Sequence, residues 1–156
     1  GTTFLENARI KARAAHELAC AAVLADDSGL IVDALDGAPG VYSSRYSGVD
    51  GDDSANNAKL LRELSAVPLA KRTARFASVL VFIDEDGLET VAEGFVEGHI
   101  GLVERGEHGF GYDPLFFPDA YNGEVTMAEL TQSQKNAISH RGNALRELRK
   151  KLHPCD

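Results

Sequence analysis

The sequence predicts an α/β fold because three patterns follow one another along the chain. A helical repeat of small and apolar residues opens it, and a helical repeat of leucines closes it. Between them lie two β-rich stretches, Thr73 to Ile83 and Leu88 to Ile100, joined at Asp86-Gly87, a dipeptide typical of hairpin turns. Helices on either side of a strand-rich centre are expected to pack against one sheet.

The first helix is expected to begin at Thr3. Thr3 and Glu6 have the spacing of a capping box, in which each side chain accepts a hydrogen bond from the backbone amide of the other residue. The helix face that packs on the sheet is then predicted to consist of small residues at helical spacing: Ala8, Ala12, Ala15 and Leu18/Ala19.

The next elements are short strands. The apolar run from Cys20 to Ala25 predicts a buried strand that ends on Asp26-Asp27-Ser28-Gly29, and Leu30 to Val32 predicts a second strand. Later in the chain, Glu89, Glu93 and Glu97 are expected on one side of their strand, facing solvent.

Two further helices have start signals. Asp52-Asp53-Ser54 offers N-cap residues for a helix that runs through Leu64 and stops near Pro68. Ser139 is expected to cap the last helix, whose buried stripe would be Leu145, Leu148 and Leu152. Residues 42–51 and 106–118 read as loops.

Composition narrows the class of protein. The chain has 156 residues, of which 44% are hydrophobic, enough for a single domain over 1–156. A net charge of −8 argues against binding of a nucleic-acid polymer. No apolar run approaches the roughly 20 residues that span a bilayer. Cys20 and Cys155 form no disulfide framework, so we expect a cytoplasmic protein without a membrane partner.

Asp26-Asp27-Ser28-Gly29 is the first candidate site. Neighbouring side chains of an extended segment point in opposite directions, so one carboxylate could face a ligand while the other braces the loop. Carboxylates suit Mg²⁺, which commonly takes one or two of them together with phosphate oxygens and water. The alternative is a plain turn, because Asp, Ser and Gly are common turn residues. Taken alone, the segment favours the turn.

Three other groups could contribute to a site. Glu6 could bind a metal and Lys11 a phosphate, although spacing alone favours capping for Glu6 and a solvated cation for Lys11. The segment from Gly109 to Pro114 could present Phe110 to a planar base, with Asp113 held extended by the following proline; a buried aromatic anchor is about equally compatible. Lys135 precedes Ser139-His140-Arg141, which would open a helix whose first-turn amides favour anions.

Taken in order, these segments make the chain similar to the family of inosine triphosphate pyrophosphatases, also called dITP/XTP pyrophosphatases. The similarity covers almost the whole chain, and the ordered set is far more specific than any one piece. The matching segments are Thr3-Phe4-Leu5-Glu6-Asn7-Ala8 with Lys11-Ala12, Ala25-Asp26-Asp27-Ser28-Gly29-Leu30, residues 39–46, residues 56–61, Arg75-Phe76, Gly109 to Pro114, Ala128-Glu129-Leu130, Lys135-Asn136 and Ser139-His140-Arg141.

The resemblance implies an elongated mixed sheet flanked by helices, with two lobes and a central cleft that holds the site. It implies Mg²⁺-dependent hydrolysis of ITP, dITP and XTP to the monophosphate and pyrophosphate, and a homodimer. By this likeness Asp27 would be the catalytic proton acceptor and, with Glu6, a metal ligand, while Asp26 would support the site. The substrate would be bound by Lys11, Ser28, Phe110, Gly111, Tyr112, Asp113, Lys135, His140 and Arg141.

The chain departs from the family pattern at its start. Members begin with a strand and a Thr/Ser-Gly-Asn-x-x-Lys loop that wraps the phosphates, and neither precedes Gly1. The sequence is therefore expected to be an N-terminally truncated form of the domain. The alternatives are a catalytically impaired nucleotide-binding fragment and a pyrophosphatase for modified pyrimidine triphosphates.

Overall fold

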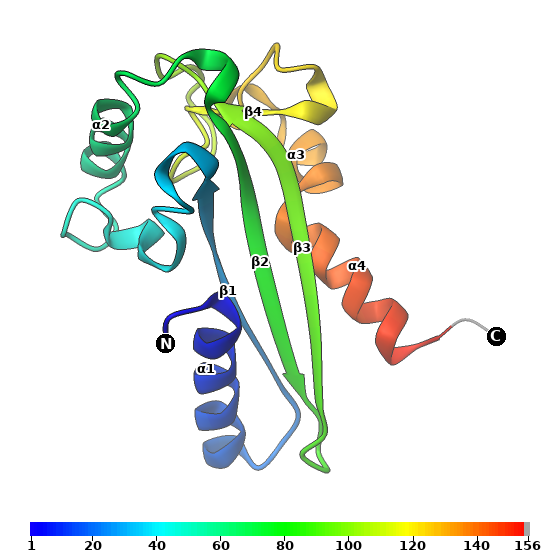
Figure 1. Cartoon of the computed structure of the whole chain (residues 1–156). Helices are drawn as coiled ribbons and strands as arrows, with labels where there is room; N and C mark the ends of the chain where they lie inside the picture. The colour runs from blue at the N-terminus through cyan, green and yellow to red at the C-terminus, as the bar shows by residue number, and fades with distance from the viewer. Residues whose placement is uncertain (155–156) are drawn as a thin grey trace. The chain divides into compact units, whose positions relative to one another are not determined.

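The computed structural model describes residues 1–154 and has one sheet with helices beside it (Figure 1). The strands pair in the order β1-β2-β3-β4, and short 3₁₀ turns lie in the connections. The elements are α1 (Phe4–Ala19), β1 (Val23–Val32), α2 (Asp53–Glu63), β2 (Thr73–Ile83), β3 (Glu89–Ile100), β4 (Phe116–Pro118), α3 (Gln132–Ile138) and α4 (His140–Leu152).

The predicted α/β class is confirmed, but the sheet is not mixed. β3 and β4 pair antiparallel, with Gly98 opposite Pro118 and Ile100 opposite Phe116. The arrows of β1, β2 and β3 alternate in direction in Figure 1. β2 and β3 are joined by a tight turn in which Leu88 N–H donates to Asp84 Oδ1 over 2.8 Å, and a connection this short requires antiparallel neighbours. The sheet of the described residues is therefore antiparallel.

Contacts divide the chain into two compact units, and strands β1, β2 and β3 contribute to both. The first unit comprises Gly1–Ser28, Ala77–Phe95 and the described residues from Ser139 onward. The second unit comprises Gly29–Phe76 and Val96–Ile138. None of the helices within residues 1–154 is long and apolar enough to cross a bilayer.

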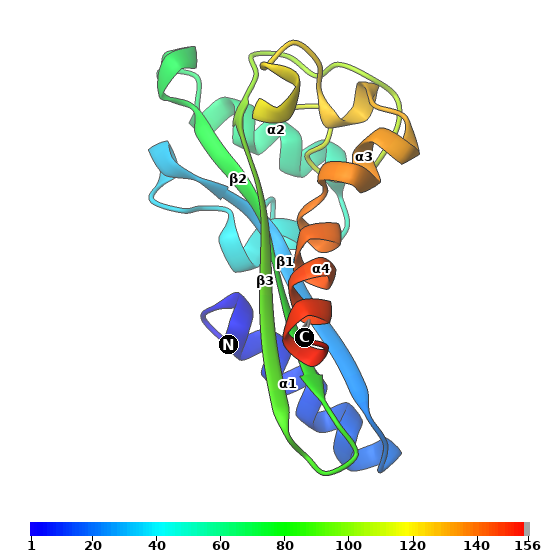
Figure 2. The same cartoon turned by 90° about the vertical axis from the view of Figure 1, so that its right-hand side faces the viewer.

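In the first unit a helix covers each face of the sheet (Figure 2). α1 packs through Ala8 and Ala12, both fully buried, against Val79 and Val81 of β2. The intervening β2 residue Leu80 faces the other way and joins the cluster formed with α4. This alternation is the period of two that a strand imposes on its side chains.

The apolar faces of both helices differ from those predicted. In α1 the predicted face stops after Ala12, because Ala15 is exposed and Leu18 is 89% exposed. In α4 the buried residues are Ala144 and Leu148, whereas Leu145 is 49% exposed and Leu152 is 38% exposed.

The α4 stripe is rotated because the helix backbone lies almost directly on β3. A Cβ atom added to Gly94 would lie 2.2 Å from both His140 O and Ala144 N. Only a glycine in the strand allows this approach, and a small residue such as Ala144 must face it, so the larger Leu145 turns outward.

Strand β1 is continuous, and this corrects two expectations. Residues 26–29 lie inside β1, neither at the end of a strand nor in a turn, and Cys20 is the left-handed residue that ends α1. Sequence patterns place a break there because Asp, Ser and Gly disfavour strands. Pairing in the sheet overrides that preference, since the backbone groups of these residues are satisfied whatever side chain they carry.

The second unit has the larger apolar core, built around Phe116, Leu60, Leu115 and Met127. α2 begins as predicted after Asp52, whose carboxylate accepts a hydrogen bond from Ala55 N–H over 3.0 Å. A buried cation that the sequence did not reveal, Arg72, closes one end of this core. Its guanidinium donates to the backbone carbonyls of Leu64, Val67 and Gly101.

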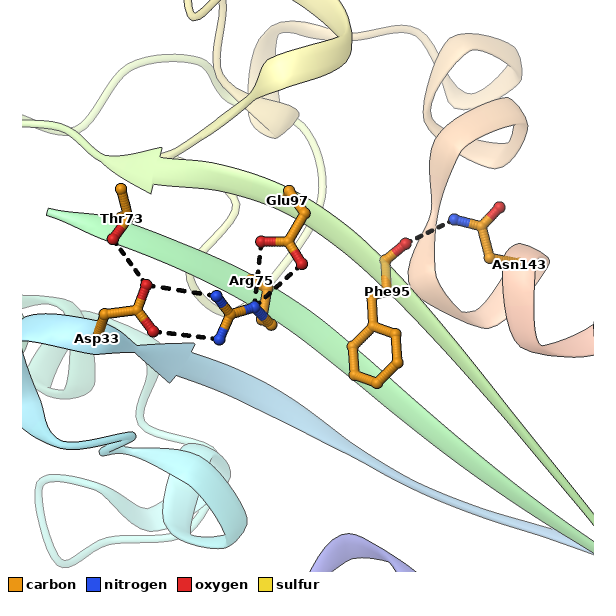
Figure 3. A network of polar contacts seen from close by, with 6 residues as sticks. All are labelled: Asp33, Thr73, Arg75, Phe95, Glu97 and Asn143. Atoms are coloured by element: carbon orange, nitrogen blue, oxygen red, sulfur yellow. Dashed lines mark hydrogen bonds and ion pairs between the residues drawn. The ribbon is translucent and has the colours of Figure 1, made fainter.

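A polar network lies on the sheet of the second unit (Figure 3). Arg75 is 3.1 Å from Asp33 Oδ1 and 3.0 Å from Glu97 Oε1. The Thr73 hydroxyl donates to Asp33 over 2.7 Å, and this bond, with the Arg75 guanidinium, holds the pKa of the Asp33 carboxyl below its ordinary value. Glu97 and Glu93 are exposed as predicted. Glu89, in the first unit, is instead half-buried and pairs with Arg9 of α1 over 2.6 Å.

We expect Gly94→Ala to destabilise the protein by about 1–3 kcal/mol, because the new methyl group meets backbone atoms that cannot rotate away. Thermal unfolding measures the change. Glu93→Ala, on the opposite and exposed face of the same strand, is the matched control and should unfold at the wild-type temperature. Equal thermal unfolding midpoints for Gly94→Ala and wild type would contradict the close approach of the α4 backbone to β3.

We expect Asp33→Asn to lower stability at neutral pH but not in acid. Since the folded-state pKa of Asp33 lies below its ordinary value of 3.8, the ionised carboxylate adds stability at higher pH, and this contribution fades as the pH falls below 3.8. The thermal unfolding midpoints of the two proteins should therefore differ at neutral pH and approach each other as the pH is lowered below 3.8. Asp86→Asn, in the exposed β2–β3 turn, is the control. If the difference in unfolding midpoint between wild type and Asp33→Asn stays constant with pH, ionisation of Asp33 is not its cause.

Candidate active site

The predicted site residues fall into two groups, one in each unit. The first unit contains Glu6, Lys11, Asp26, Asp27, Ser28, His140 and Arg141, and the second contains Phe110, Gly111, Tyr112, Asp113 and Lys135. The expectation of a cleft that joins the two groups remains a prediction from the family resemblance.

Asp27 is held from the α1 side of strand β1. Lys11 Nζ lies 2.8 Å from Asp27 Oδ1, and Asn7 Nδ2 donates to Asp27 Oδ2 over 3.2 Å. Lys11 also donates to the backbone carbonyl of Asp26. Both carboxylate oxygens of Asp27 therefore have a donor, and a side chain that is 19% exposed is fixed in one orientation.

Asp26 and Ser28 point the other way and meet α4. Arg141 Nε lies 3.0 Å from Asp26 Oδ2, and Arg141 Nη2 donates to Ser28 Oγ over 3.2 Å. The prediction that adjacent carboxylates diverge is confirmed. The acidic partner also explains how a cation is accommodated in the first turn of a helix, where the dipole disfavours positive charge.

The start of α4 is set by Ser139, as predicted. Its hydroxyl accepts a hydrogen bond from Gly142 N–H over 3.1 Å. His140 follows directly in the first turn and is half-buried. Arg141 is about half exposed, so its guanidinium is accessible to a ligand while Asp26 holds it.

Glu6 forms only half of the predicted capping box. Thr3 Oγ1 accepts from Glu6 N–H over 3.1 Å, as expected. The Glu6 carboxylate, however, bonds one residue further upstream, accepting from Thr2 N–H over 2.6 Å and from the Thr2 hydroxyl over 2.9 Å. Thr2 thus donates to the Glu6 carboxylate through both its amide and its hydroxyl. The Thr2 amide, followed by its hydroxyl, lowers the pKa of Glu6, which keeps this carboxyl ionised.

The donor chemistry of the first unit fits a hard divalent cation. Glu6 and Asp27 supply carboxylate oxygens, the ligands that Mg²⁺ prefers. Within residues 1–154 no three His, Cys, Asp or Glu side chains gather into a metal cluster.

In the second unit, the Asp113 side chain stabilises the Gly109–Asp113 loop through contacts with the loop backbone and with α3. Its carboxylate is buried, accepts from Phe110 N–H over 3.1 Å and forms an ion pair with Lys135 of α3. Gly109 has φ +83°, and a Cβ there would lie 2.2 Å from Asp113 Oδ2. The first glycine of the loop is therefore required both by its backbone angle and by the closeness of the carboxylate.

The two aromatic residues of this loop have different environments. Phe110 is 62% exposed, and Lys135 Nζ lies 4.5 Å from the centroid of its ring. Tyr112 is 4% exposed and donates from its hydroxyl to Ser43 O over 2.7 Å; burial raises its pKa. Phe110 can accept a stacked ring, whereas Tyr112 anchors the loop, and any ligand contact from Tyr112 would come from its backbone.

A hollow of about 240 Å³ lies beside the Asp113–Lys135 pair. His108 and Gly109 line it on the loop side, and Met127 and Lys135 are among the residues of its other walls. The place of His108 on this wall depends on the fold of residues far along the chain, so no local sequence pattern reveals it.

Asn7 is a site residue that sequence reasoning quoted only as part of a motif. Its amide holds Asp27 across a gap of twenty positions. The available signal was an asparagine in the first helical turns, a residue with poor helix propensity that often has another use for its side chain.

These features define an α/β protein in which the second unit presents an exposed aromatic ring, suited to a planar ring, and the first presents accessible cations beside carboxylates, suited to an anionic group. The model of the Ham1 family matches residues 1–151, and the chain belongs to this family.

Relatives and solved structures agree with this assignment. Proteins named dITP/XTP pyrophosphatase are 53% identical over 154 residues in Oceanobacillus iheyensis (98% of this chain, 77% of the relative) and 56% identical over 151 residues in Nocardia farcinica (95% and 71%). The Staphylococcus aureus Ham1 protein superposes with a TM-score of 0.92 at 44% identity, over 99% of this chain and 78% of that one. The structure of a Mycobacterium abscessus nucleoside-triphosphatase / dITP/XTP pyrophosphatase superposes with a TM-score of 0.84 at 48% identity. The match covers 97% of this chain and 76% of that one.

Proposed function

We propose that this protein hydrolyses deaminated purine nucleoside triphosphates, such as ITP, dITP and XTP, to the monophosphate and pyrophosphate. The observation that carries the proposal is Asp27, a half-buried carboxylate in the middle of a strand, held between an amide and an ammonium group. The names of relatives more than 50% identical over nearly the whole chain support the same activity.

Asp27 is the proposed general base. It orients a water molecule toward the α-phosphorus and accepts its proton as the bond to the β-phosphate breaks and pyrophosphate leaves. Asn7 restrains one carboxylate oxygen throughout. Lys11, whose side chain is 51% exposed, is free to move its ammonium group from Asp27 to an arriving phosphate, which would leave the second oxygen available to the water.

Mg²⁺ is the proposed cofactor, with Glu6 and Asp27 as its protein ligands. When bound, it would neutralise charge on the triphosphate and make the phosphorus more electrophilic. The contribution of Glu6 is to remain ionised, which its hydrogen bonds from Thr2 favour.

The nucleotide is proposed to be recognised from both units. In the second unit Phe110 stacks on the base, and the Asp113–Lys135 pair with Gly111 and Tyr112 shapes the loop beside it. In the first unit Ser28, His140 and Arg141 contact the nucleotide, and Asp26 braces Arg141.

Selectivity for a 6-keto base follows from the chemistry of arginine. A guanidinium group only donates hydrogen bonds. The 6-keto oxygen of hypoxanthine or xanthine accepts such a bond, whereas the 6-amino group of adenine would place donor against donor. A cytoplasmic location and a homodimeric assembly remain predictions from the sequence and the family resemblance.

We expect the protein to release pyrophosphate from ITP, dITP and XTP in the presence of Mg²⁺, and EDTA to abolish the release. A coupled pyrophosphate assay on a panel that includes ATP and a modified pyrimidine triphosphate measures this. Preference for the pyrimidine would replace the proposed substrate class. Binding without turnover would identify a nucleotide-binding protein.

In the same assay Asp27→Asn should lower kcat for ITP by roughly 10²–10⁴-fold, because a neutral amide cannot accept the proton from water. Asp86→Asn, which removes the same charge from an exposed turn of the same unit, should leave kcat unchanged. Turnover of Asp27→Asn within a few fold of wild type across several pH values would exclude Asp27 as the base.

Arg141→Ala should lower kcat/KM for ITP sharply and that for ATP hardly at all, so that the ratio between them narrows. A lost hydrogen bond to a charged donor is worth about 1.5–3 kcal/mol, or roughly 10–100-fold. Asp26→Ala should narrow the ratio less, because Arg141 remains but is no longer held. Arg149→Ala, an exposed cation on the same helix, is the control. Equal losses on ITP and ATP would show that Arg141 does not read the base.

A further inference from the structure

Helix α2 holds both polar backbone groups of Gly111, the central residue of the Gly109–Asp113 loop. Gly111 N–H donates to Asp53 Oδ2 over 2.8 Å, and Asn57 Nδ2 donates to Gly111 O over 3.0 Å. The backbone N–H and C=O of one residue are thus both hydrogen-bonded to side chains of the same helix. We call this pair of contacts the Gly111 clamp.

The clamp is built on a firm support. Asp53 and Asn57 are four positions apart, so their side chains lie on one face of α2. The helix is fastened to the second unit by Leu60, which is fully buried. Asn56 adds a second anchor, since its Oδ1 accepts from Ser47 N–H over 2.7 Å.

The orientation of the Asn57 amide follows from its partner. Gly111 O is an acceptor, so the nitrogen of the amide must face it, and Oδ1 must point the other way. Asn57 is 3% exposed, and among the described residues Oδ1 has no hydrogen-bond partner. A buried acceptor without a donor lowers the stability of the folded protein. The orientation in which Asn57 donates to Gly111 therefore leaves one unfavourable group, Oδ1, in the core.

Gly111 itself needs to be held. Its φ is +60°, a conformation that glycine adopts freely but from which it can also easily depart. A Cβ atom at this position would meet nothing within 4 Å, so neighbouring atoms do not confine the residue sterically. The hydrogen bonds from α2 therefore restrain this point of the loop, and Phe110, with its exposed ring, is the preceding residue.

We propose that Asp53 and Asn57 are positioning residues for nucleotide binding, which act by fixing Gly111 and thereby the direction of the Phe110 ring. This rests on the proposed function, in that the loop is taken to bind the base. A loop fixed before binding loses less conformational entropy when the nucleotide arrives, so the clamp strengthens binding without touching the ligand. Neither residue takes part in proton transfer.

Four variants separate the clamp from the stability of α2. Asp53→Ala removes the acceptor for Gly111 N–H, whereas Asp53→Asn keeps an oxygen that can accept the same bond. Asn57→Asp replaces the donor by an oxygen that faces the Gly111 carbonyl, with almost no change of shape. Asp52→Ala is the matched control, because it removes the N-cap of the same helix without touching Gly111.

The primary measurement is the Kd of ITP by calorimetry in EDTA, which does not require turnover. Asp53→Ala and Asn57→Asp should raise Kd about tenfold, the order expected for one lost hydrogen bond of this kind. Asp53→Asn should stay within about twofold of wild type, since it retains the acceptor. Asp52→Ala should lower the melting temperature and leave Kd unchanged. With Mg²⁺, KM should follow Kd while kcat stays within about twofold.

Amide hydrogen exchange of Gly111 provides a readout that needs no nucleotide. Asp53→Ala should speed this exchange and Asp52→Ala should not. Because Asp53 is exposed, its variants are expected to fold even if Asn57→Asp does not. If Asp53→Ala speeds the exchange of the Gly111 amide but leaves the Kd of ITP unchanged, the clamp is only a structural contact and the proposal is overturned. Equal increases of Kd in Asp52→Ala and Asp53→Ala would also overturn it.

Failure of the proposed function is distinguishable from failure of the clamp. If wild type binds ITP but does not hydrolyse it, the proposed hydrolysis is wrong and the Kd series still tests the clamp. If wild type binds no nucleotide either in EDTA or with Mg²⁺, both proposals fall. Rescue of Kd by Asp53→Asn is the result that a purely structural role would not produce.

Discussion

Side chains in strand β1 point alternately to the two faces of the sheet, and this alternation separates residues that are neighbours in the sequence. Asp27 faces α1 and meets Asn7 and Lys11, while Asp26 and Ser28 face α4 and meet Arg141. The chemistry of the first unit thus requires a helix on each face, and the small residues of α1 and the glycine in β3 let both helices lie close enough.

An acidic protein that binds a triphosphate must place its cations individually. The net charge is −8, yet three carboxylates among the candidate site residues have a cationic partner each: Lys11 for Asp27 and Arg141 for Asp26 in the first unit, and Lys135 for Asp113 in the second. Such pairs leave little positive potential to attract a nucleic-acid polymer, but in the first unit the Lys11 and Arg141 side chains, each 51% exposed, remain accessible to a small anion. The overall charge and the local charges therefore give a consistent description of the ligand.

The parts of the structure that sequence could predict are those with local causes. The caps at Thr3, Asp52 and Ser139 locate three helices, and the hairpin turn locates β2 and β3. Two errors have tertiary causes: sheet pairing carries β1 through two aspartates, and Gly94 lets α4 lie so close to β3 that its buried stripe is rotated. A third is local, since the Glu6 carboxylate bonds to Thr2 rather than to Thr3. The contacts of Asp27 and Gly111 span long stretches of chain, so no spacing rule reveals them.

The approach of α4 to β3 at Gly94 also bears on how this sequence can vary. Backbone atoms, rather than interlocking side chains, set the depth at which the helix lies. Substitutions on the outer face of α4, at Leu145 or Arg149, can therefore accumulate without shifting the helix, and drift there should be nearly neutral. The same geometry makes Gly94 intolerant of substitution, because any side chain there would displace the helix turn that carries His140 and Arg141. A substitution at Gly94 would therefore alter ligand recognition without contacting the ligand.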